Sequence, residues 1–227
     1  MQEGGGMDAK ERAARSAVAQ VASGQVVGLG TGSTASRALQ VLADRIRDEG
    51  LEVIGVPTSR ATEEESRRLG IPLTTLEEHP VVDLAFDGAD QVDARLAAIK
   101  GYGGALLREK IVARCAKRLL IMVDASKLAE TLHLAVPVEV LPFGLGAARH
   151  HLERIGGQPR LRLRQGAPYL TDNGNQIFDA DFGEIRDPGA LAARIAELPG
   201  VVGHGLFVDL VDEVHVGEAD CARVVRR

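Results

Sequence analysis

Four side chains able to move or stabilise a proton lie within a short stretch of this sequence. They are Asp87, Asp90, Lys100 and Glu109, and the glycine-rich stretch 101–104 (GYGG) separates the lysine from the glutamate. Carboxylates act as general acids and bases, and a fixed ammonium group stabilises negative charge that develops on oxygen. Acid, base and cation brought together predict proton-transfer chemistry on a small anionic substrate.

The elements around these residues must hold them at one place. The apolar run 81–86 (VVDLAF) predicts a buried strand that ends immediately before Asp87. In open α/β sheets, ligands bind just beyond the carboxyl ends of the strands, where Asp87 and Asp90 would lie. Each signal has an ordinary alternative, because aspartates beside glycine are common in turns and an isolated lysine is usually a solvated charge.

Glu109 lies on a predicted helix that spans about residues 104–117. The apolar stripe of that helix is predicted from three residues at helical spacing: Leu107, Ile111 and Cys115. Glu109 lies roughly opposite this stripe, so it is either an exposed surface group or faces a cleft above the sheet. Its basic neighbours, Arg108 and Lys110, are expected to be solvated rather than catalytic.

A second polar segment, 28–34 (GLGTGST), joins a predicted strand to a predicted helix. Its N–H groups and hydroxyls could hold a phosphate at the positive end of the helix. A tight turn with Ser33 or Thr34 as the helix N-cap fits the pattern about as well. The glycines also fit a loose dinucleotide fingerprint, but the next strand ends without an acidic residue to hold a ribose. We therefore disfavour a nicotinamide cofactor, and the P-loop pattern fails because no Lys-Ser or Lys-Thr follows.

The first 130 residues alternate short apolar runs with helical patterns, which predicts βα units in a parallel, doubly wound sheet. Such a sheet would bring four polar loops to one edge: Thr31–Thr34, Thr58-Ser59, Asp87–Asp90 and Asp124–Lys127. Within the last of these loops, Lys127 is either an anion-binding cation or part of a helix-capping turn.

The pattern changes after about residue 132. The order strand, helix, strands, helix, strand predicts a ferredoxin-like α+β unit. Its elements are expected at 136–140, 145–155, 160–164, 169–170, 177–178, 189–198 and 201–202, with a hairpin turn at 172–175. Segments 207–208 and 214–216 are expected to return to the first sheet. We therefore predict a Rossmann-like domain of residues 1–132 plus 207–227 and a smaller α+β domain of residues 133–206.

Composition narrows the class of protein. The chain has 227 residues, of which 45% are hydrophobic and 26% charged, as in an ordinary globular protein. The net charge of −5, the 3% aromatic content and the absence of Trp argue against a nucleic-acid-binding surface. No apolar run approaches the roughly 20 residues of a membrane span, and residues 1–10 lack the apolar core of a signal peptide. Gly4–Gly6 is expected to be a flexible end, or to follow a start codon placed early, rather than a phosphate loop.

The cysteines and histidines give no metal-binding pattern. Cys115 and Cys221 are far apart in sequence and are expected to be reduced thiols, which favours a cytoplasmic protein. His150-His151 has no carboxylate or cysteine at ligand spacing, so a solvated helix face is expected there.

Several segments, in this order along the chain, resemble those of the A-type ribose-5-phosphate isomerases. The matching segments are 30–35 (GTGSTA), 57–59 (PTS), 87–90 (DGAD), 100–101 (KG), 108–110 (REK), 124–127 (DASK), 136–140 (VPVEV) and 171–175 (TDNGN). The resemblance covers about residues 10–217. It implies interconversion of D-ribose 5-phosphate and D-ribulose 5-phosphate in the non-oxidative pentose phosphate pathway. It further implies an enediolate intermediate, no metal or organic cofactor, and a homodimer or homotetramer.

The resemblance also assigns residues. Glu109 matches the proton acceptor of the family, Lys100 would stabilise the enediolate charge, and Asp87 and Asp90 would move hydroxyl protons and help open the sugar ring. The matching substrate-binding positions are Thr31, Gly32, Ser33, Thr34, Asp87, Gly88, Ala89, Asp90, Lys100, Gly101, Tyr102, Gly103 and Lys127. Tyr102 stands where the family usually has glycine, and a positive φ there would strain a tyrosine.

A second hypothesis is a phosphosugar-sensing domain that binds its ligand without turnover. Regulators of related fold carry a DNA-binding helix-turn-helix domain, for which this chain has no room. The presence of both Glu109 and Lys100 favours an enzyme.

Overall fold

The computed structural model describes residues 8–227, so the predicted flexible end at Gly4–Gly6 lies outside the described residues. A six-stranded sheet forms the larger layer, with the strand order β15-β14-β6-β3-β1-β2. Its strands are β1 (Gln25–Leu29), β2 (Val53–Pro57), β3 (Leu84–Gly88), β6 (Leu119–Asp124), β14 (Glu213–Gly217) and β15 (Ala222–Arg226). All neighbours pair in parallel except β14 and β15. The predicted parallel sheet is confirmed.

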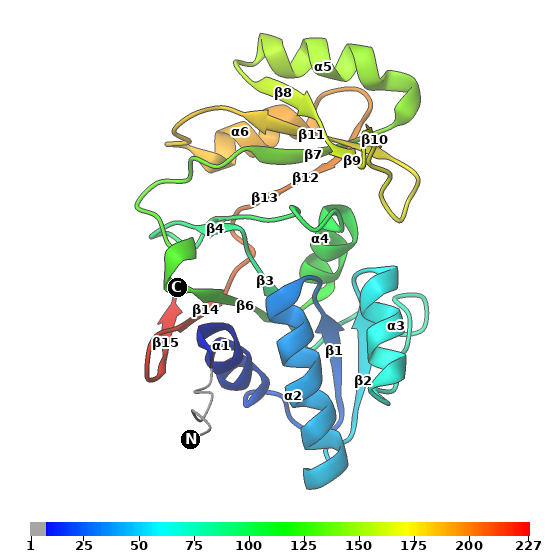
Figure 1. Ribbon diagram of the computed structural model, residues 1–227, viewed down its shortest axis with the longest axis vertical. Coiled ribbons are helices and arrows are strands. Elements are labelled where there is room, and N and C mark those ends of the chain that lie inside the picture. Colours follow the sequence, from blue (N-terminus) through cyan, green and yellow to red (C-terminus); the bar gives the residue numbers. More distant parts are fainter. Residues whose placement is uncertain (1–7) are drawn as a thin grey trace.

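Helices cover this sheet on both faces (Figure 1). They are α1 (Ala9–Val18), α2 (Ser33–Glu49), α3 (Arg60–Arg68) and α4 (Leu106–Cys115). One apolar cluster packs α1 and α2 against Val27, Phe86 and Met122 of the sheet, all fully buried. A second cluster packs α4 against the opposite face, where alternate residues of the same strands point. Helix α3 lies beside β2 at the edge.

A second, antiparallel sheet stacks on the first in Figure 1, with helices on its outer side. Its order is β12-β7-β11-β8. The elements are β7 (Val136–Val140), α5 (Leu145–Arg154), β8 (Gln158–Leu161), β11 (Gln176–Asp181), α6 (Pro188–Ala196) and β12 (Val201–His204). Numbered within the unit, this order is 4-1-3-2, as the predicted ferredoxin-like arrangement requires.

Short elements lie between the two sheets or at their margins. A three-stranded sheet has the order β13-β5-β4, and β9 pairs with β10. Their bounds are β4 (Gln91–Val92), β5 (Ala98–Ile99), β9 (Leu163–Arg164), β10 (Ala167–Pro168) and β13 (Leu206–Phe207), with 3₁₀ turns η1 (Ala125–Lys127) and η2 (Pro142–Gly144). Within residues 8–227, no helix is long and apolar enough to cross a membrane.

Three local predictions are wrong. The turn at 172–175 does not join paired strands at 169–170 and 177–178, because β11 forms its ladders with β7 and β8 instead. The strand expected at 160–164 is interrupted at Arg162. The side chain of Arg162 donates hydrogen bonds to Asp179 and to the carbonyl of Gly101. Residue Phe207 pairs with Ala98 of β5 rather than with the first sheet, so of the two predicted segments only 214–216, in β14, returns there.

We propose the domain division 1–132 plus 207–227 and 133–206 as the boundary between the two units. Two core clusters support it. Leu206 packs in the cluster of the second sheet, whereas Phe207 packs in the cluster beneath α4. Leu132 also packs with the second sheet.

Candidate active site

The four polar loops meet at one edge of the first sheet, as predicted. Because β2, β1, β3 and β6 are consecutive neighbours in a parallel sheet, their carboxyl ends all lie on that edge. A cavity of about 140 Å³ opens there. Its lining residues are Lys10, Thr31, Gly32, Ser33, Thr34, Gly88, Ala89, Asp90, Lys100, Gly101, Gly103, Glu109, Val123, Asp124 and Lys127. The two predicted residues outside this lining are Asp87, buried behind it, and Tyr102, on its outer side.

Asp87, Lys100 and Glu109 form a buried cluster of charges at the base of the cavity. All three are at most 4% exposed. Lys100 Nζ lies 2.9 Å from Asp87 Oδ2 and 3.2 Å from Glu109 Oε2, and it also donates to the carbonyl of Gly88. Although Glu109 Oε2 lies within ion-pair distance of the ammonium, no hydrogen bond of good geometry reaches it among the described residues. One carboxylate oxygen therefore has spare hydrogen-bonding capacity at the base of the cavity.

Burial decides the ionisation of this cluster. Burial raises the pKa of Glu109 above its ordinary value; the Lys100 charge opposes that rise, and the Asp87 charge adds to it. Burial alone would lower the pKa of Lys100, but the charges of Asp87 and Glu109 outweigh it, so that pKa is raised. The ammonium is thus held charged, while the Glu109 carboxylate is more basic than an exposed glutamate.

Asp87 is fixed by the backbone on its other side. Its Oδ1 accepts from Thr31 N at 3.0 Å and from its own neighbour Gly88 N at 2.8 Å. Gly30 makes this approach possible, because a Cβ on it would lie 2.3 Å from Asp87 Oδ1 and 2.6 Å from Phe86 O. The glycine loop after β1 and the aspartate near the end of β3 are therefore one packed unit.

Helix α4 presents Glu109 inward, contrary to the predicted apolar stripe. The buried residues of this helix are Leu106, Glu109, Val112 and Ala113, whereas Ile111 of the predicted stripe is 45% exposed. Small and branched side chains pack on the sheet, so the turn that carries Glu109 sits over the strand ends. Of the two alternatives for Glu109, the cleft is correct.

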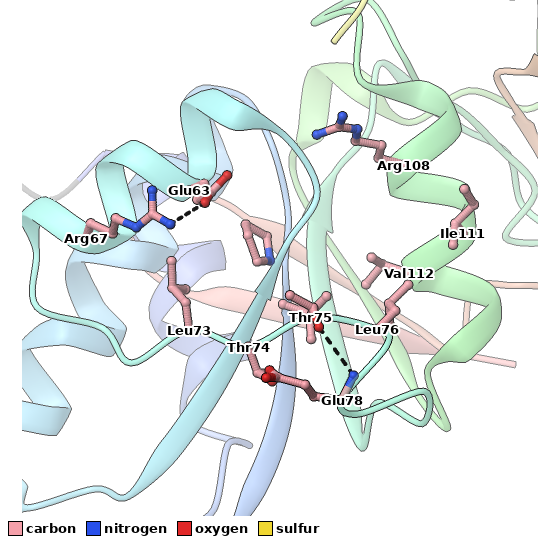
Figure 2. A pocket seen from close by; sticks show the side chains of 12 residues that line it. Glu63, Arg67, Leu73, Thr74, Thr75, Leu76, Glu78, Arg108, Ile111 and Val112 are labelled. Carbon is pink, nitrogen blue, oxygen red and sulfur yellow. Dashed lines mark hydrogen bonds and ion pairs between the residues drawn. The ribbon is translucent and has the colours of Figure 1, made fainter. Parts of the chain in front are cut away.

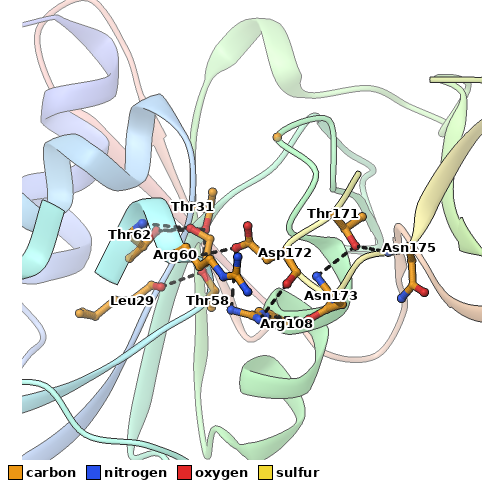
Figure 3. Close-up of polar contacts among 12 residues, drawn as sticks. Leu29, Thr31, Thr58, Arg60, Thr62, Arg108, Thr171, Asp172, Asn173 and Asn175 are labelled. Atoms are coloured by element: carbon orange, nitrogen blue, oxygen red, sulfur yellow. Dashed lines mark hydrogen bonds and ion pairs between the residues drawn. The ribbon is translucent and has the colours of Figure 1, made fainter. Parts of the chain in front are cut away.

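Of the two basic neighbours of Glu109, Lys110 is largely buried, contrary to expectation, whereas Arg108 stays about one third exposed. Lys110 Nζ donates to Leu206 O at 2.9 Å, contacts His204 Nδ1 at 3.1 Å and lies over the Phe207 ring. Arg108 Nε donates to Asn173 Oδ1 at 2.9 Å, and Figure 3 shows this contact beside Asp172. Lys110 thus joins α4 to residues 204–206, and Arg108 joins it to the turn at 172–173.

The glycine loop ends in a helix start without a side-chain cap. Gly32, at φ 103°, is the N-cap of α2, and neither Ser33 nor Thr34 takes the expected capping role. Lys10, which lies on α1, donates a hydrogen bond from Nζ to Ser33 Oγ at 3.0 Å. The sequence analysis missed Lys10, because a lysine in the first turn of an amphipathic helix carries no distinguishing pattern.

A hydroxyl cluster supports the same loop from the β2–α3 junction (Figure 3). The Thr31 hydroxyl lies 2.8 Å from that of Thr58, 2.9 Å from that of Ser59 and 3.1 Å from that of Thr62. The Thr62 hydroxyl in turn donates to Gly30 O. The loop is thereby held at a fixed height above the sheet.

The β6 loop combines both features proposed for it. Asp124 caps η1 by accepting from Ser126 N at 3.0 Å, and Lys127 at the end of η1 lines the cavity. Lys10, Lys127 and the start of α2 thus place positive potential at one end of the cavity, away from the buried carboxylates.

The glycine-rich turn after Lys100 accommodates Tyr102 without the suspected strain. The positive φ angles fall on Gly101 (107°) and Gly104 (86°), not on Tyr102. Tyr102 N donates to Asp90 Oδ2 at 3.0 Å, and its hydroxyl donates to Ala135 O at 3.1 Å. Burial raises the pKa of Asp90, and the Tyr102 N–H and the charge of Lys100 oppose that rise.

A larger cavity of about 390 Å³ lies between α3 and the outer face of α4 (Figure 2). It is lined mainly by Val56, Leu73, Leu76, Ile111 and Val112, with the Glu63–Arg67 ion pair at its side. It holds no cluster of carboxylates around a buried cation. Within residues 8–227, no group of three or more His, Cys, Asp or Glu side chains could hold a metal ion.

Fold and cavity together define an α/β protein that gathers carboxylates, a buried ammonium and hydroxyls at the strand ends of one parallel sheet. Comparison with known proteins gives the family. The sequence model of the family ribose 5-phosphate isomerase A (phosphoriboisomerase A) matches residues 54–221 of this chain. The chain belongs to the ribose 5-phosphate isomerase A family.

Individual relatives match over nearly the whole chain. Ribose-5-phosphate isomerase A of Roseiflexus castenholzii is 53% identical over 205 residues, with 88% of each chain covered. That of Thermomicrobium roseum is 50% identical over 223 residues, covering 96% of this chain and 94% of the relative. The structure of ribose 5-phosphate isomerase A from Methanocaldococcus jannaschii is 41% identical with a TM-score of 0.93, covering 97% and 99%. The structure of a D-ribose-5-phosphate isomerase in complex with phospho-erythronic acid has a TM-score of 0.94 at 34% identity. The match covers 97% of this chain and 100% of that one.

Proposed function

We propose that this protein interconverts D-ribose 5-phosphate and D-ribulose 5-phosphate by proton transfer through an enediolate. The observation that carries the proposal is the buried cluster of Asp87, Lys100 and Glu109, at most 4% exposed, at the base of a cavity whose other end is cationic. Family membership supports the same reaction class and does not favour a sensing domain without turnover.

Glu109 is the proposed base. It removes the proton from the carbon beside the aldehyde and returns it to the neighbouring carbon, so one carboxylate serves both transfers. Its raised pKa brings it nearer to neutral pH, where a general base is most effective. Glu109 Oε2, which accepts no hydrogen bond of good geometry from the described residues, has a lone pair free for such a proton.

Lys100 is the proposed electrostatic stabiliser. Negative charge develops on the substrate oxygens as the enediolate forms, and a preorganised ammonium stabilises that charge without reorganising. Its contacts with Asp87, Glu109 and Gly88 O hold it in place before the substrate arrives.

We propose Asp90 rather than Asp87 for ring opening. Both oxygens of Asp87 are already occupied by backbone N–H groups and by Lys100, and Asp87 does not line the cavity. Asp90 does line it, and only its Oδ2 is taken, by Tyr102 N. Its raised pKa favours exchange of a proton with a sugar hydroxyl.

The phosphate is proposed to bind at the start of α2. Backbone N–H groups and hydroxyls of Thr31–Thr34 face it, with Lys10 and Lys127 on either side. The proposed substrate-binding set also includes Gly88, Ala89, Lys100, Gly101 and Gly103, which line the same cavity, and Tyr102, which acts through its backbone N–H on Asp90.

The remaining proposals concern context. We propose a cytoplasmic homodimer or homotetramer that needs no metal or organic cofactor. Light scattering should give two or four times the chain mass, cell fractionation should find the protein with cytoplasmic markers, and dialysis against EDTA should leave the activity intact. A monomer, a membrane or envelope fraction, or activity restored only by added zinc or magnesium would each contradict one part.

The test of the reaction is NMR of ribose 5-phosphate mixed with the protein in deuterated water. We expect ribulose 5-phosphate to appear, with deuterium at the transferred position to the extent that Glu109 exchanges its proton with solvent. Binding without any product, at protein concentrations that saturate the sugar, would instead favour the sensing domain.

A further inference from the structure

Arg162 connects the second sheet to the glycine-rich turn of the cavity. It lies between β8 and β9, about sixty residues along the chain from that turn. One of its terminal nitrogens donates to Gly101 O at 2.8 Å and to Tyr102 O at 3.1 Å. Both carbonyls belong to the residues that directly follow Lys100.

The arginine is itself held rigidly. Its Nε donates to Asp179 Oδ2 at 2.9 Å, and its other terminal nitrogen pairs with Asp179 Oδ1 from β11, which makes a bidentate contact. Its guanidinium also lies over the rings of Tyr102 and Tyr169, 5.9 and 6.0 Å from their centres. The side chain is only 13% exposed, so its geometry is well determined by its surroundings.

Apart from the hydrogen bond that Gly104 N donates to Gly101 O at 3.0 Å, the turn has few internal means of keeping its shape. Gly101 and Gly104 both have positive φ, a conformation that glycine also leaves easily. Yet the Tyr102 N–H must point at Asp90 Oδ2, and Lys100 must reach Asp87 and Glu109. The carbonyl contacts from Arg162 supply a restraint from outside the turn.

We propose that Arg162 is a positioning residue for the isomerisation: it holds the Gly101–Tyr102 carbonyls so that the turn keeps Tyr102 N on Asp90 and Lys100 in the buried cluster. The inference rests on the proposed function. A purely structural role would be to join the two sheets, and it predicts lower thermal stability without any change at Asp90.

The ionisation of Asp90 separates these roles. Burial raises the pKa of Asp90. The Tyr102 N–H and the charges of Lys100, Lys127 and Arg162 lower that pKa. Loss of Arg162 should remove one lowering charge and loosen the Tyr102 contact. The pKa of Asp90 should then rise further.

The test compares Arg162→Met, Arg162→Lys and the control Arg160→Met. Arg160 is an exposed arginine on β8, so its loss removes an equal charge two residues before Arg162. Measured quantities are kcat, KM, melting temperature and the ¹³C titration of the Asp90 carboxyl, assigned with Asp90→Asn. Assays are run well below each melting temperature. If Arg162→Met does not fold, Arg162→Lys replaces it in the comparison with Arg160→Met.

We expect Arg162→Met to lower kcat/KM by about 10- to 100-fold, the scale on which small misplacements of reacting groups act. The Asp90 titration should move to higher pH. Arg162→Lys should restore only part of the titration and little of the rate, because lysine returns the charge but not the rigid fork that holds the turn and its Tyr102 contact with Asp90. Arg160→Met should resemble the wild type.

The inference is overturned if folded Arg162→Met, or folded Arg162→Lys in its place, keeps kcat/KM within about twofold of Arg160→Met. It is also overturned if the rate falls while the Asp90 titration stays in place. Failure of the proposed function looks different, since the wild type would then lack isomerase activity or Glu109→Gln would retain it.

Discussion

The loop Thr31–Thr34 and the cluster of Asp87, Lys100 and Glu109 lie in one cavity but are built differently. The loop comes from a single strand–helix junction, Gly32 and Ser33 are exposed, and much of its polarity is backbone. The cluster draws on β3, the turn after β5 and α4, and it is almost fully buried. Under the proposed roles, the anionic end would bind where solvent reaches the loop, whereas proton transfer would use charges fixed by distant parts of the chain.

The strongest test of this contrast is Glu109→Gln. Glutamine keeps the shape of the side chain but cannot accept a carbon-bound proton, and general-base catalysis contributes about 10²–10⁴ in rate. We expect kcat to fall by that factor while KM changes much less, because the anionic end lies elsewhere. A folded variant with near-wild-type kcat would remove Glu109 as the base and make Asp87 or Asp90 the leading candidate.

The complementary experiment removes the phosphate instead of the base. Binding energy from a remote group helps to position the reacting carbons, so free ribose should have a kcat/KM at least about 100-fold lower than ribose 5-phosphate. Lys10→Met should raise KM for ribose 5-phosphate and leave kcat/KM for free ribose unchanged. Equal kcat/KM values for the two sugars would mean that the loop Thr31–Thr34 does not bind a phosphate.

The buried end should also respond to pH. Because burial raises the pKa of Glu109, the base form accumulates at higher pH than the ordinary value of about 4.3, and the acid limb of kcat/KM should lie above it. Folded protein then binds more protons than unfolded protein between the two pKa values. Its free energy of unfolding should therefore decrease as pH rises through that window.

Glu109→Gln serves as the control for this stability effect, since it should flatten the decrease. An acid limb at the ordinary glutamate value, measured on stable protein, would show that the Glu109 carboxyl is as hydrated as an exposed one.

The smallest expected effect is at Tyr102, which lies outside the cavity lining and contacts the lining residue Asp90 through its backbone N–H. Tyr102→Gly keeps the N–H that donates to Asp90 and loses the hydroxyl contact with Ala135 O. We expect kcat/KM to fall less than tenfold. If Tyr102→Gly lowers kcat/KM as much as Lys100→Met does, the tyrosine ring takes a direct part in catalysis.

Much of the fold follows from local patterns. Apolar runs and helical spacing located β1, β2, β3, β6 and β7 to within a few residues, and the rule that parallel strand ends share an edge brought their loops together. The failures were non-local. Strands β4, β5 and β13 are two residues long, too short for any period, and they pair only because the two sheets approach each other.

The site divides in the same way. The loop at Thr31–Thr34 has a recognisable glycine pattern. In contrast, the sequence around Lys10 and Arg162 does not predict their contacts with Ser33 and Gly101. The face of α4 was misjudged because helical spacing alone ranks Ile111 above Glu109 as a buried residue. Only the cation of Lys100 makes burial of that carboxylate tolerable, and Lys100 is nine positions away.

Gly30 has a consequence for how this protein can vary. Any side chain at position 30 would collide with Asp87 and with the backbone of β3, so adaptation there cannot proceed by single steps. A saturation library at this codon, selected for growth dependent on the protein, should return glycine alone. Randomising position 87 as well should return no alternative, because the carbonyl oxygen of Phe86 would still lie 2.6 Å from the added Cβ. Position 30 is therefore constrained by backbone that no substitution of a neighbouring side chain can remove.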